Sequence, residues 1–286
     1  MNSLGLWHSK ELMIEFDVNI FISSKYDDYI EFGLKCFLPK WQEDVSYEVF
    51  LFLPYTISKN NVKNIELSND LQLLKSMFNE DISIEINKYT KIKYDDKKKL
   101  CIRNLYDFDV SHRANGSIIK VDLKHSSAEC DNYYYRFRVD KLFGFKNVYD
   151  DNIAVVEWVY KKAKHIDFTI NKDDKLPNSI TDAMKHYSNK IHKINFFLIT
   201  NDKLNIIYSS TLHHNIKTAS EKWKKHYLNI KNNRKNDELI IYHFKQKDIF
   251  IKLSEVSISL LLKTLIIILI IFTIMANYKT IFGNFY

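Results

Sequence analysis

The glycines that nucleotide-binding loops require are scarce in this sequence. Its five glycines are never closer together than 28 residues. The Rossmann, P-loop and kinase nucleotide-binding loops each need two or three glycines within about eight residues, because only glycine lets backbone N–H groups close on a phosphate. The chain therefore contains none of these loops.

Two groups of histidine and charged residues have the types that metal or acid–base chemistry uses. His213 and His214 are adjacent, and neighbouring side chains of a strand point to opposite faces, so they do not predict a shared metal site. Asp109, His112 and Arg113 could form an acid–base pair. Because no nucleophile motif such as GxSxG lies nearby, a loop salt bridge is the better interpretation. We therefore expect no catalytic residue, no metal site, no cofactor and no enzymatic activity.

The cysteines do not form a recognisable binding motif. Cys36, Cys101 and Cys130 are odd in number and far apart, and no CxxC motif is present. Zinc sites and disulfide-rich scaffolds both need cysteines paired at short or regular spacings. We therefore expect neither a zinc site nor a disulfide framework.

A basic run is the main candidate for contact with an anion. The net charge of the chain is +7, which permits binding of nucleic acid or anionic lipid without requiring it. Basic side chains interleaved with Trp223 and Tyr227 suit the phosphates of RNA, DNA or lipid, whereas a solvated helix face is the alternative. The basic residues are Lys217, Lys222, Lys224, Lys225, Lys231, Arg234 and Lys235, and Glu221 is the one acid among them.

A second candidate combines aromatic and basic side chains. Tyr133, Tyr134, Tyr135, Arg136 and Arg138 follow one another almost without interruption. Such residues could stack on a nucleotide or single strand and neutralise its phosphates. Alternation along a strand would bury half of them, so we favour packing against the core and neighbouring strands.

The C-terminal segment has the composition of a transmembrane helix. Residues 256–276 are apolar except for two serines, two threonines and one lysine. A helix of this length rises about 31 Å, which matches a hydrocarbon core of about 30 Å. The lysine lies eight residues into the segment, where its ammonium can reach back to the headgroups. The span is represented by Val256, Lys263, Leu265, Ile270 and Ala276.

Lysines on either side of this segment predict its orientation. Lys245, Lys247 and Lys252 precede it, and only Lys279 follows. By the positive-inside rule, residues 1–250 lie in the cytoplasm and the short tail, residues 277–286, crosses the cell inner membrane. The N-terminus lacks the apolar region of a signal peptide. We expect a single-pass protein, and the sequence fits both constitutive spanning and insertion on activation.

Residues 1–250 are expected to form a mainly antiparallel, β-rich domain, of the α+β class or a β-sandwich rather than α/β. Apolar and polar residues alternate as in strands with one buried face, in segments 14–22, 30–36, 82–86, 119–123, 135–139 and 166–170. Residues 49–53 are continuously apolar, which predicts a central strand covered on both faces. Residues 196–200 and 204–209 flank turn-forming residues and predict a hairpin.

Few helices are expected in this domain. Apolar residues recur from Ile180 to Ile191 with helical spacing, just after Pro177, and predict an amphipathic helix. Two further helices are expected around residues 71–78 and 218–229. Residues 171–178 (NKDDKLPN) could divide the domain in two or form a surface loop within it.

The overall plan resembles the membrane effectors of bacterial anti-phage systems. A cytoplasmic domain is followed by one apolar segment in a sequence rich in Lys, Ile and Asn, as in effectors that accompany retrons or cyclic-nucleotide signalling. The resemblance is architectural and carries over no residue. It implies a toxin-like effector of antiviral defence that partners hold inactive and that perturbs the inner membrane during abortive infection. Its partners would be the lipid bilayer, a protein or nucleic acid of the defence complex, and further copies of the chain. The alternative is a membrane-tethered adaptor or enzyme.

Overall fold

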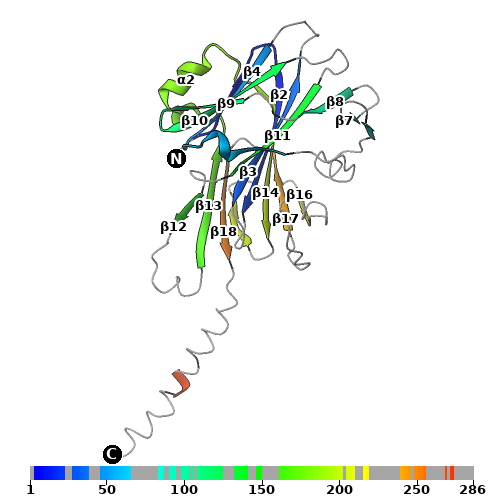
Figure 1. Ribbon diagram of the computed structural model, residues 1–286. Helices are drawn as coiled ribbons and strands as arrows, with labels where there is room; N and C mark the ends of the chain where they lie inside the picture. The colour runs from blue at the N-terminus through cyan, green and yellow to red at the C-terminus, as the bar shows by residue number, and fades with distance from the viewer. Residues whose placement is uncertain are drawn as a thin grey trace, which may run out of the picture.

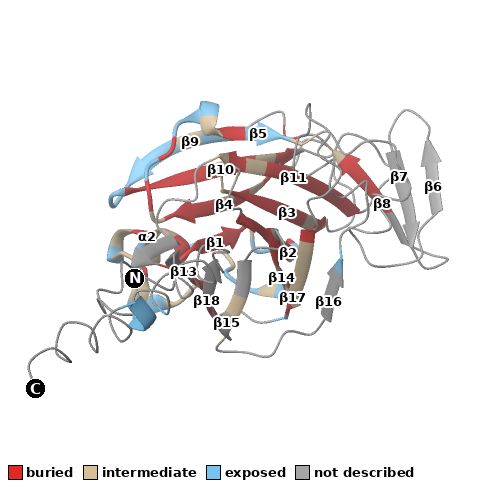
Figure 2. Cartoon of the chain, turned by 90° about the horizontal axis from the view of Figure 1, so that it is seen from below, coloured by how far each residue is buried: buried red, intermediate tan, exposed pale blue. Residues whose placement is uncertain are grey.

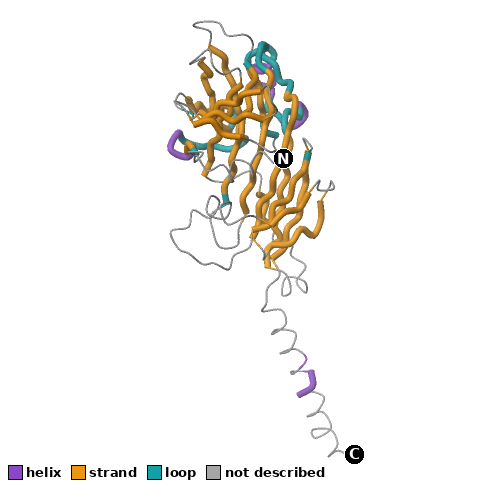
Figure 3. The backbone as a smooth tube through the Cα atoms, turned by 90° about the vertical axis from the view of Figure 1, so that its right-hand side faces the viewer, coloured by secondary structure: helices purple, strands orange, loops and turns teal. Residues whose placement is uncertain are grey.

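The computed structural model of the chain describes residues 3–22, 28–38, 46–65, 83–86, 90–94, 98–103, 105, 108–124, 132–140, 146–149, 161–201, 204–209, 215–218, 239–245, 248–255, 268 and 271–273. Strands make up most of this part of the chain, as the orange tube in Figure 3 shows. The expected β-rich, mainly antiparallel fold is confirmed.

The largest sheet has ten strands in the order β16-β17-β14-β2-β3-β11-β8-β7-β6, with β5 also paired to β11. Neighbouring strands run antiparallel except for the pairs β14–β2 and β11–β8. The strands are β2 (Met13–Ile22), β3 (Tyr29–Phe37), β5 (Val62–Asn64), β6 (Ser83–Ile86), β7 (Thr90–Tyr94), β8 (Lys98–Arg103), β11 (Asn132–Asp140), β14 (Ile191–Asn201), β16 (Asn215–Thr218) and β17 (Leu239–Phe244).

Two four-stranded sheets complete the body (Figure 1). One has the order β1-β4-β10-β9, with strands β1 (Gly5–His8), β4 (Ser46–Leu53), β9 (Phe108–Arg113) and β10 (Gly116–Lys124). The other has the order β12-β13-β18-β15, with strands β12 (Lys146–Tyr149), β13 (Lys161–Thr169), β15 (Leu204–Ser209) and β18 (Asp248–Glu255). A parallel bridge between Leu4 and Ile170 links the two small sheets.

All three sheets contribute to one hydrophobic core. The ten-stranded sheet supplies Phe16, Phe32 and Phe137 among others, and the small sheets supply side chains such as Leu51 and Phe168. Phe16 and Phe32 stack with their ring centroids 5.6 Å apart. Alternation of side chains along β2, β3 and β11 sends every second residue into this core, which is why the period-two pattern predicted these strands correctly.

Strand β4 is covered on both faces, as its continuous apolar sequence predicts. Leu51 faces the main core, whereas Phe52 packs in a second cluster with Trp7, Ile118 and helix α2 (Asn178–Met184). Figure 2 shows β4 and β10 as buried strands and the edge strand β9 as largely exposed. The short α2 therefore shields the outer face of this small sheet.

Two sequence-based expectations about residues 180–209 are wrong. The helix ends at Met184, and Ile191 begins β14 instead of continuing the helix. The backbone of Ser188 pairs with that of His8, which holds the chain extended before β14. The expected hairpin is absent because β14 pairs with β2 and β17, whereas β15 pairs with β18 in another sheet.

Residues 171–178 are tied to the N-terminal strand. Asn171 has a positive φ of 52°, and its side-chain amide forms hydrogen bonds of 2.7 and 2.8 Å with the backbone N–H and C=O of Leu6. A short 3₁₀ helix, η2 (Asp173–Lys175), follows; the other, η1 (Lys59–Asn61), precedes β5. The main core contains residues on both sides of this segment, from Leu4 to Ile251.

One cysteine is disulfide-bonded, although the sequence predicted no disulfide framework. It is Cys101 on β8, and its partner lies outside the described residues. Sequence spacing did not predict this bond because disulfides join residues that the fold brings together, whatever their separation along the chain. Cys36 is a free thiol buried in the core, and burial raises its pKa to about 12.

Candidate functional site

The face of the ten-stranded sheet opposite the main core carries a cluster of buried charged side chains. Along β3 the core-facing residues alternate with Glu31, Gly33 and Lys35, and β11 presents Tyr134, Arg136 and Arg138 in the same way. The antiparallel register of these strands pairs Arg138 with Glu31, Arg136 with Gly33 and Tyr134 with Lys35. Residues directly opposite each other share a face, so the register gathers the charges in one place.

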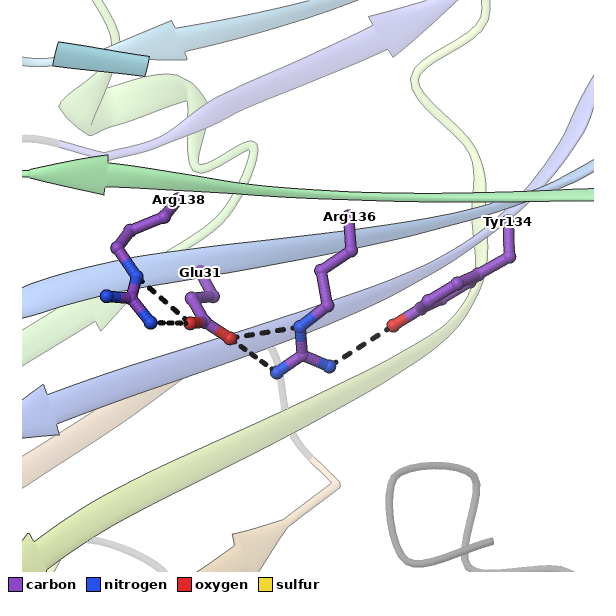
Figure 4. Close-up of polar contacts among 4 residues, drawn as sticks. All are labelled: Glu31, Tyr134, Arg136 and Arg138. Atoms are coloured by element: carbon purple, nitrogen blue, oxygen red, sulfur yellow. Dashed lines mark hydrogen bonds and ion pairs between the residues drawn. The ribbon is translucent and has the colours of Figure 1, made fainter. Parts of the chain in front are cut away.

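Glu31 lies between two arginines (Figure 4). One carboxylate oxygen accepts hydrogen bonds from Nε and Nη2 of Arg136 at 2.9 and 2.6 Å, and the other accepts from Nε and Nη2 of Arg138 at 3.1 and 2.7 Å. The side chain of Glu31 is fully buried, and those of Arg136 and Arg138 are 2% and 15% exposed. Charge-assisted pairs of this kind are strong and fix the orientation of the planar groups.

Tyr134 extends the cluster across β3. Its hydroxyl oxygen accepts a hydrogen bond from Nη1 of Arg136 at 3.4 Å. A Cβ atom on Gly33 would lie 2.4 Å from that oxygen, so only glycine leaves room for the ring at this point. Burial raises the pKa of Tyr134, which keeps its hydroxyl neutral.

A second polar chain crosses β2, β14 and β17 on the same sheet. Nδ2 of Asn195 donates to Oδ1 of Asp17 at 2.7 Å, and Nε2 of His243 lies 3.4 Å from Oδ1 of Asn195. The His243 ring also stacks on Phe197, with centroids 4.5 Å apart. Burial raises the pKa of Asp17, and the Asn195 hydrogen bond and the Arg136 charge oppose that rise.

This buried cluster fixes strand register and lacks a group arranged for catalysis. A buried ion pair gains little net stability over apolar packing, but breaking it leaves a charge without a partner. A one-residue slip of β3 against β11 would separate Glu31 from both arginines and turn its side chain to the core. The described residues contain no group of three or more His, Cys, Asp or Glu side chains placed to hold a metal ion.

The tyrosine and arginine run therefore packs as preferred from the sequence. Tyr133 and Tyr135 face the core, and Tyr134 and Arg136 are buried on the opposite face. Sequence reasoning missed Glu31 as the partner of both arginines. The signal was an acid at an alternating position of a strand, which becomes informative only once β3 and β11 are known to be neighbours.

Asp109 and His112 lie on the exposed strand β9 and do not contact each other. The Asp109 carboxylate is 3.9 Å from Nζ of Lys59, and Nδ1 of His112 is 3.2 Å from the Ser117 hydroxyl. The expected salt bridge within a loop is therefore wrong, because the motif lies on a strand and Asp109 pairs with Lys59 outside the motif. The adjacent histidines His213 and His214 both lie outside the described residues.

The basic run and the apolar C-terminal segment lie mostly outside the described residues. This holds for Lys222, Lys224, Lys225, Lys231, Arg234 and Lys235, and for Val256, Lys263, Leu265, Ile270 and Ala276. Lys217 is part of the edge strand β16. Within the described part of the chain, no helix is both long and apolar enough to cross a bilayer.

Four residues of the apolar C-terminal segment are described. Ile268 and residues 271–273 are helical, and Figure 1 draws residues 271–273 away from the sheets. The side chains of Ile268 and Ile271 are each 50% exposed, and that of Phe272 is 70% exposed. Large apolar side chains are therefore present on a helical segment that the body does not bury.

The buried cluster generates a stability prediction. Glu31→Gln keeps the shape of the side chain but removes the negative charge to which both Arg136 and Arg138 are bonded, so we expect a loss of about 3–5 kcal/mol in the free energy of unfolding. Urea unfolding of the full chain in nonionic detergent, followed by circular dichroism, measures it. The matched control is Glu48→Gln, because Glu48 pairs with Lys120 at 2.7 Å with both side chains about one-third exposed. We expect that control to lose less than about 1 kcal/mol; equal losses in the two variants would contradict the role given to Glu31.

Comparisons with models of protein families and with the sequences of curated proteins found no match to this chain. Function has to be inferred from its own residues and fold.

Proposed function

We propose that the chain is a membrane-anchored effector, in which residues 256–276 insert in a bilayer and the β-rich body controls what that segment does there. The observation that carries the anchor is the exposure of Ile268, Ile271 and Phe272 on a helical segment. Exposed apolar surface costs about 25 cal/mol per Å², and transfer into hydrocarbon would recover that free energy. Their neighbours in sequence are almost all Ile and Leu, so turning the helix exposes no polar face to water.

The body supports a role in binding or regulation more than in catalysis. Its buried charges are engaged in strand-to-strand pairs. The Ser117 hydroxyl lies beside His112, but it is buried and accepts a hydrogen bond from the backbone N–H of Ile57. A rigid domain of this kind can hold a membrane segment inactive through a partner and release it. In the anti-phage version of this proposal, release perturbs the inner membrane and stops growth. The alternative remains a membrane-tethered adaptor or enzyme.

Two observations favour opposite orientations of the body. Lys245, Lys247 and Lys252 precede the segment and only Lys279 follows, which favours a cytoplasmic body. Disulfides, in contrast, persist mainly in oxidising compartments, and Cys101 is disulfide-bonded. We give more weight to the lysines, because they lie next to the segment that would be inserted.

The anchor predicts how the protein fractionates. Full-length chain expressed in bacteria should stay in the membrane fraction after alkaline carbonate extraction, because carbonate strips proteins that do not enter the hydrocarbon. A chain ending at Ser254 should move to the supernatant. Release of the full-length chain by carbonate would contradict the anchor.

Orientation predicts the behaviour of a reporter fused after Tyr286. A reporter that is active only outside the cytoplasm should be active there, and a cytoplasmic reporter at the same position should be silent. The reversed pattern has two explanations, which the state of Cys101 in cells separates. If Cys101 is in a disulfide, the body lies outside the cytoplasm. If Cys101 is reduced, the helix lies on the membrane surface.

The effector proposal predicts depolarisation that depends on Lys263. A charge at that depth is costly unless it reaches the headgroups or faces a wet interior between associated helices. If it faces such an interior, Lys263→Leu should anchor equally well but abolish depolarisation and growth arrest on overexpression. Membrane-potential dyes in cells with matched protein levels make the measurement. A full-length chain that neither depolarises nor slows growth would contradict the effector proposal and leave the tethered adaptor.

A further inference from the structure

A pocket lies where the β1–β2 connection meets the start of β14. Its volume is about 490 Å³, within the range of about 300–1,000 Å³ that is usual for small-molecule sites. One wall is formed by the turn before β2 and the first residue of that strand, and the other by the chain that leads into β14. The lining residues are Lys10, Leu12, Met13, Ser188, Lys190, Ile191 and His192.

The two walls of the pocket are fixed to each other. The backbones of His8 and Ser188 exchange two hydrogen bonds of 2.8 Å each. The buried His8 ring adds a contact of 2.9 Å between its Nε2 and the carbonyl oxygen of Lys190. A ligand would therefore meet a preformed site and would not need to order it, which favours affinity.

The pocket combines unpaired positive charge with exposed apolar surface. Lys10, Lys190 and His192 are all exposed, and within the described part of the chain none of them forms an ion pair. The acid next in sequence, Glu11, does not line the pocket. Beside these side chains lie Leu12, Ile191 and Met13, the last of which is 43% exposed although large apolar side chains are usually buried.

We propose that this pocket binds a small organic phosphate. Lys10 and Lys190 together can neutralise the two negative charges of a phosphate monoester, and the His192 ring can donate a hydrogen bond to a phosphate oxygen. A single carboxylate would leave one lysine without a partner. The apolar part of the ligand rests against Met13 and Ile191. Neither an inorganic ion nor an uncharged apolar compound uses both halves of the pocket.

The position of the pocket assigns the ligand to solution instead of a lipid headgroup. Strand β14 leads from Ile191 at the pocket to Asn201, a length of about 33 Å. Three residues later Leu204 pairs with Glu255, directly before the proposed membrane segment. Figure 1 shows the same relation, with α2 at one end of the body and the end of β18 at the other. Only this choice between the two sources of phosphate rests on the proposed anchor; binding itself does not.

The test uses phenyl phosphate as the probe and the full chain in nonionic detergent. Isothermal titration calorimetry should give an affinity for phenyl phosphate at least about tenfold higher than for inorganic phosphate or for phenol, since each of these has only half of the recognised chemistry. The double substitution Lys10→Gln and Lys190→Gln should lower that affinity about tenfold or more. No heat of binding at millimolar phenyl phosphate would overturn the proposal.

A matched control separates the pocket from general surface charge. Lys193 is an exposed lysine of β14 that does not line the pocket, so Lys193→Gln should leave the affinity unchanged. Met13→Ser should weaken phenyl phosphate but not inorganic phosphate. If Lys193→Gln weakens binding as much as the double substitution does, the site is a diffuse surface attraction and the proposal is wrong.

A last arm distinguishes the two sources of the phosphate. The full chain is placed in vesicles of phosphatidylcholine, with and without phosphatidylglycerol, and titrated with phenyl phosphate. Equal affinities support a ligand from solution, because the pocket is farther from the surface than the Debye length of about 8–10 Å. A lower affinity with phosphatidylglycerol, removed by Lys10→Gln and Lys190→Gln, would show that lipid headgroups occupy the pocket. Carbonate extraction tests the anchor separately, so failure of one proposal does not imply failure of the other.

Discussion

The pairing of one buried carboxylate with two guanidinium groups is the constraint on which the central sheet depends. Strands β3 and β11 bury most of both of their faces, and only one of these faces is apolar. Charged side chains on the other face can be buried only if each one meets a partner with good geometry. Glu31 meets this condition for Arg136 and Arg138 together, and it does so in one register alone.

The need to give each buried charge a partner also explains why Gly33 and Asp17 occur at their positions. Gly33 is needed because the Tyr134 ring crosses β3 at that position on its way to Arg136. Asp17 is accepted in a buried place because Asn195 donates to it and Arg136 is close, although burial still raises its pKa. These side chains form one polar layer over five strands, opposite the layer of phenylalanine and isoleucine that joins the three sheets. A buried charged layer of this kind adds little net stability over apolar packing, but a slip in register would leave its charges without partners.

The two ends of the body suit the two functions proposed for the pocket and for the apolar segment. Residues 188–192 and the start of β2 form the basic pocket at one end, and Glu255 leads toward the apolar segment at the other. Strand β14 runs between these ends through the polar layer, since Asn195 contacts both Asp17 and His243. A ligand in the pocket would therefore contact the first residues of β14, a strand that continues to the opposite end of the body.

Local pattern in the sequence determined which segments are strands, because side chains alternate with a period of two whenever one face is buried. It predicted β2, β3, β10, β11 and β13, and it identified β4 as covered on both faces. It also predicted an apolar C-terminal segment that could anchor the chain, from composition alone. It overextended α2 to Ile191, because helical spacing can occur by chance across a helix end and a following strand.

Tertiary structure decided which of these strands are neighbours. The pairing of Glu31 with Arg136 and Arg138 joins residues more than 100 positions apart, and the walls of the pocket come from residues 10–13 and 188–192. The hairpin expected between β14 and β15 failed for the same reason, since the two strands enter different sheets. Hydrogen-bonded neighbours in a sheet are chosen by the burial of whole faces, a property of the assembled fold that no local window of sequence contains.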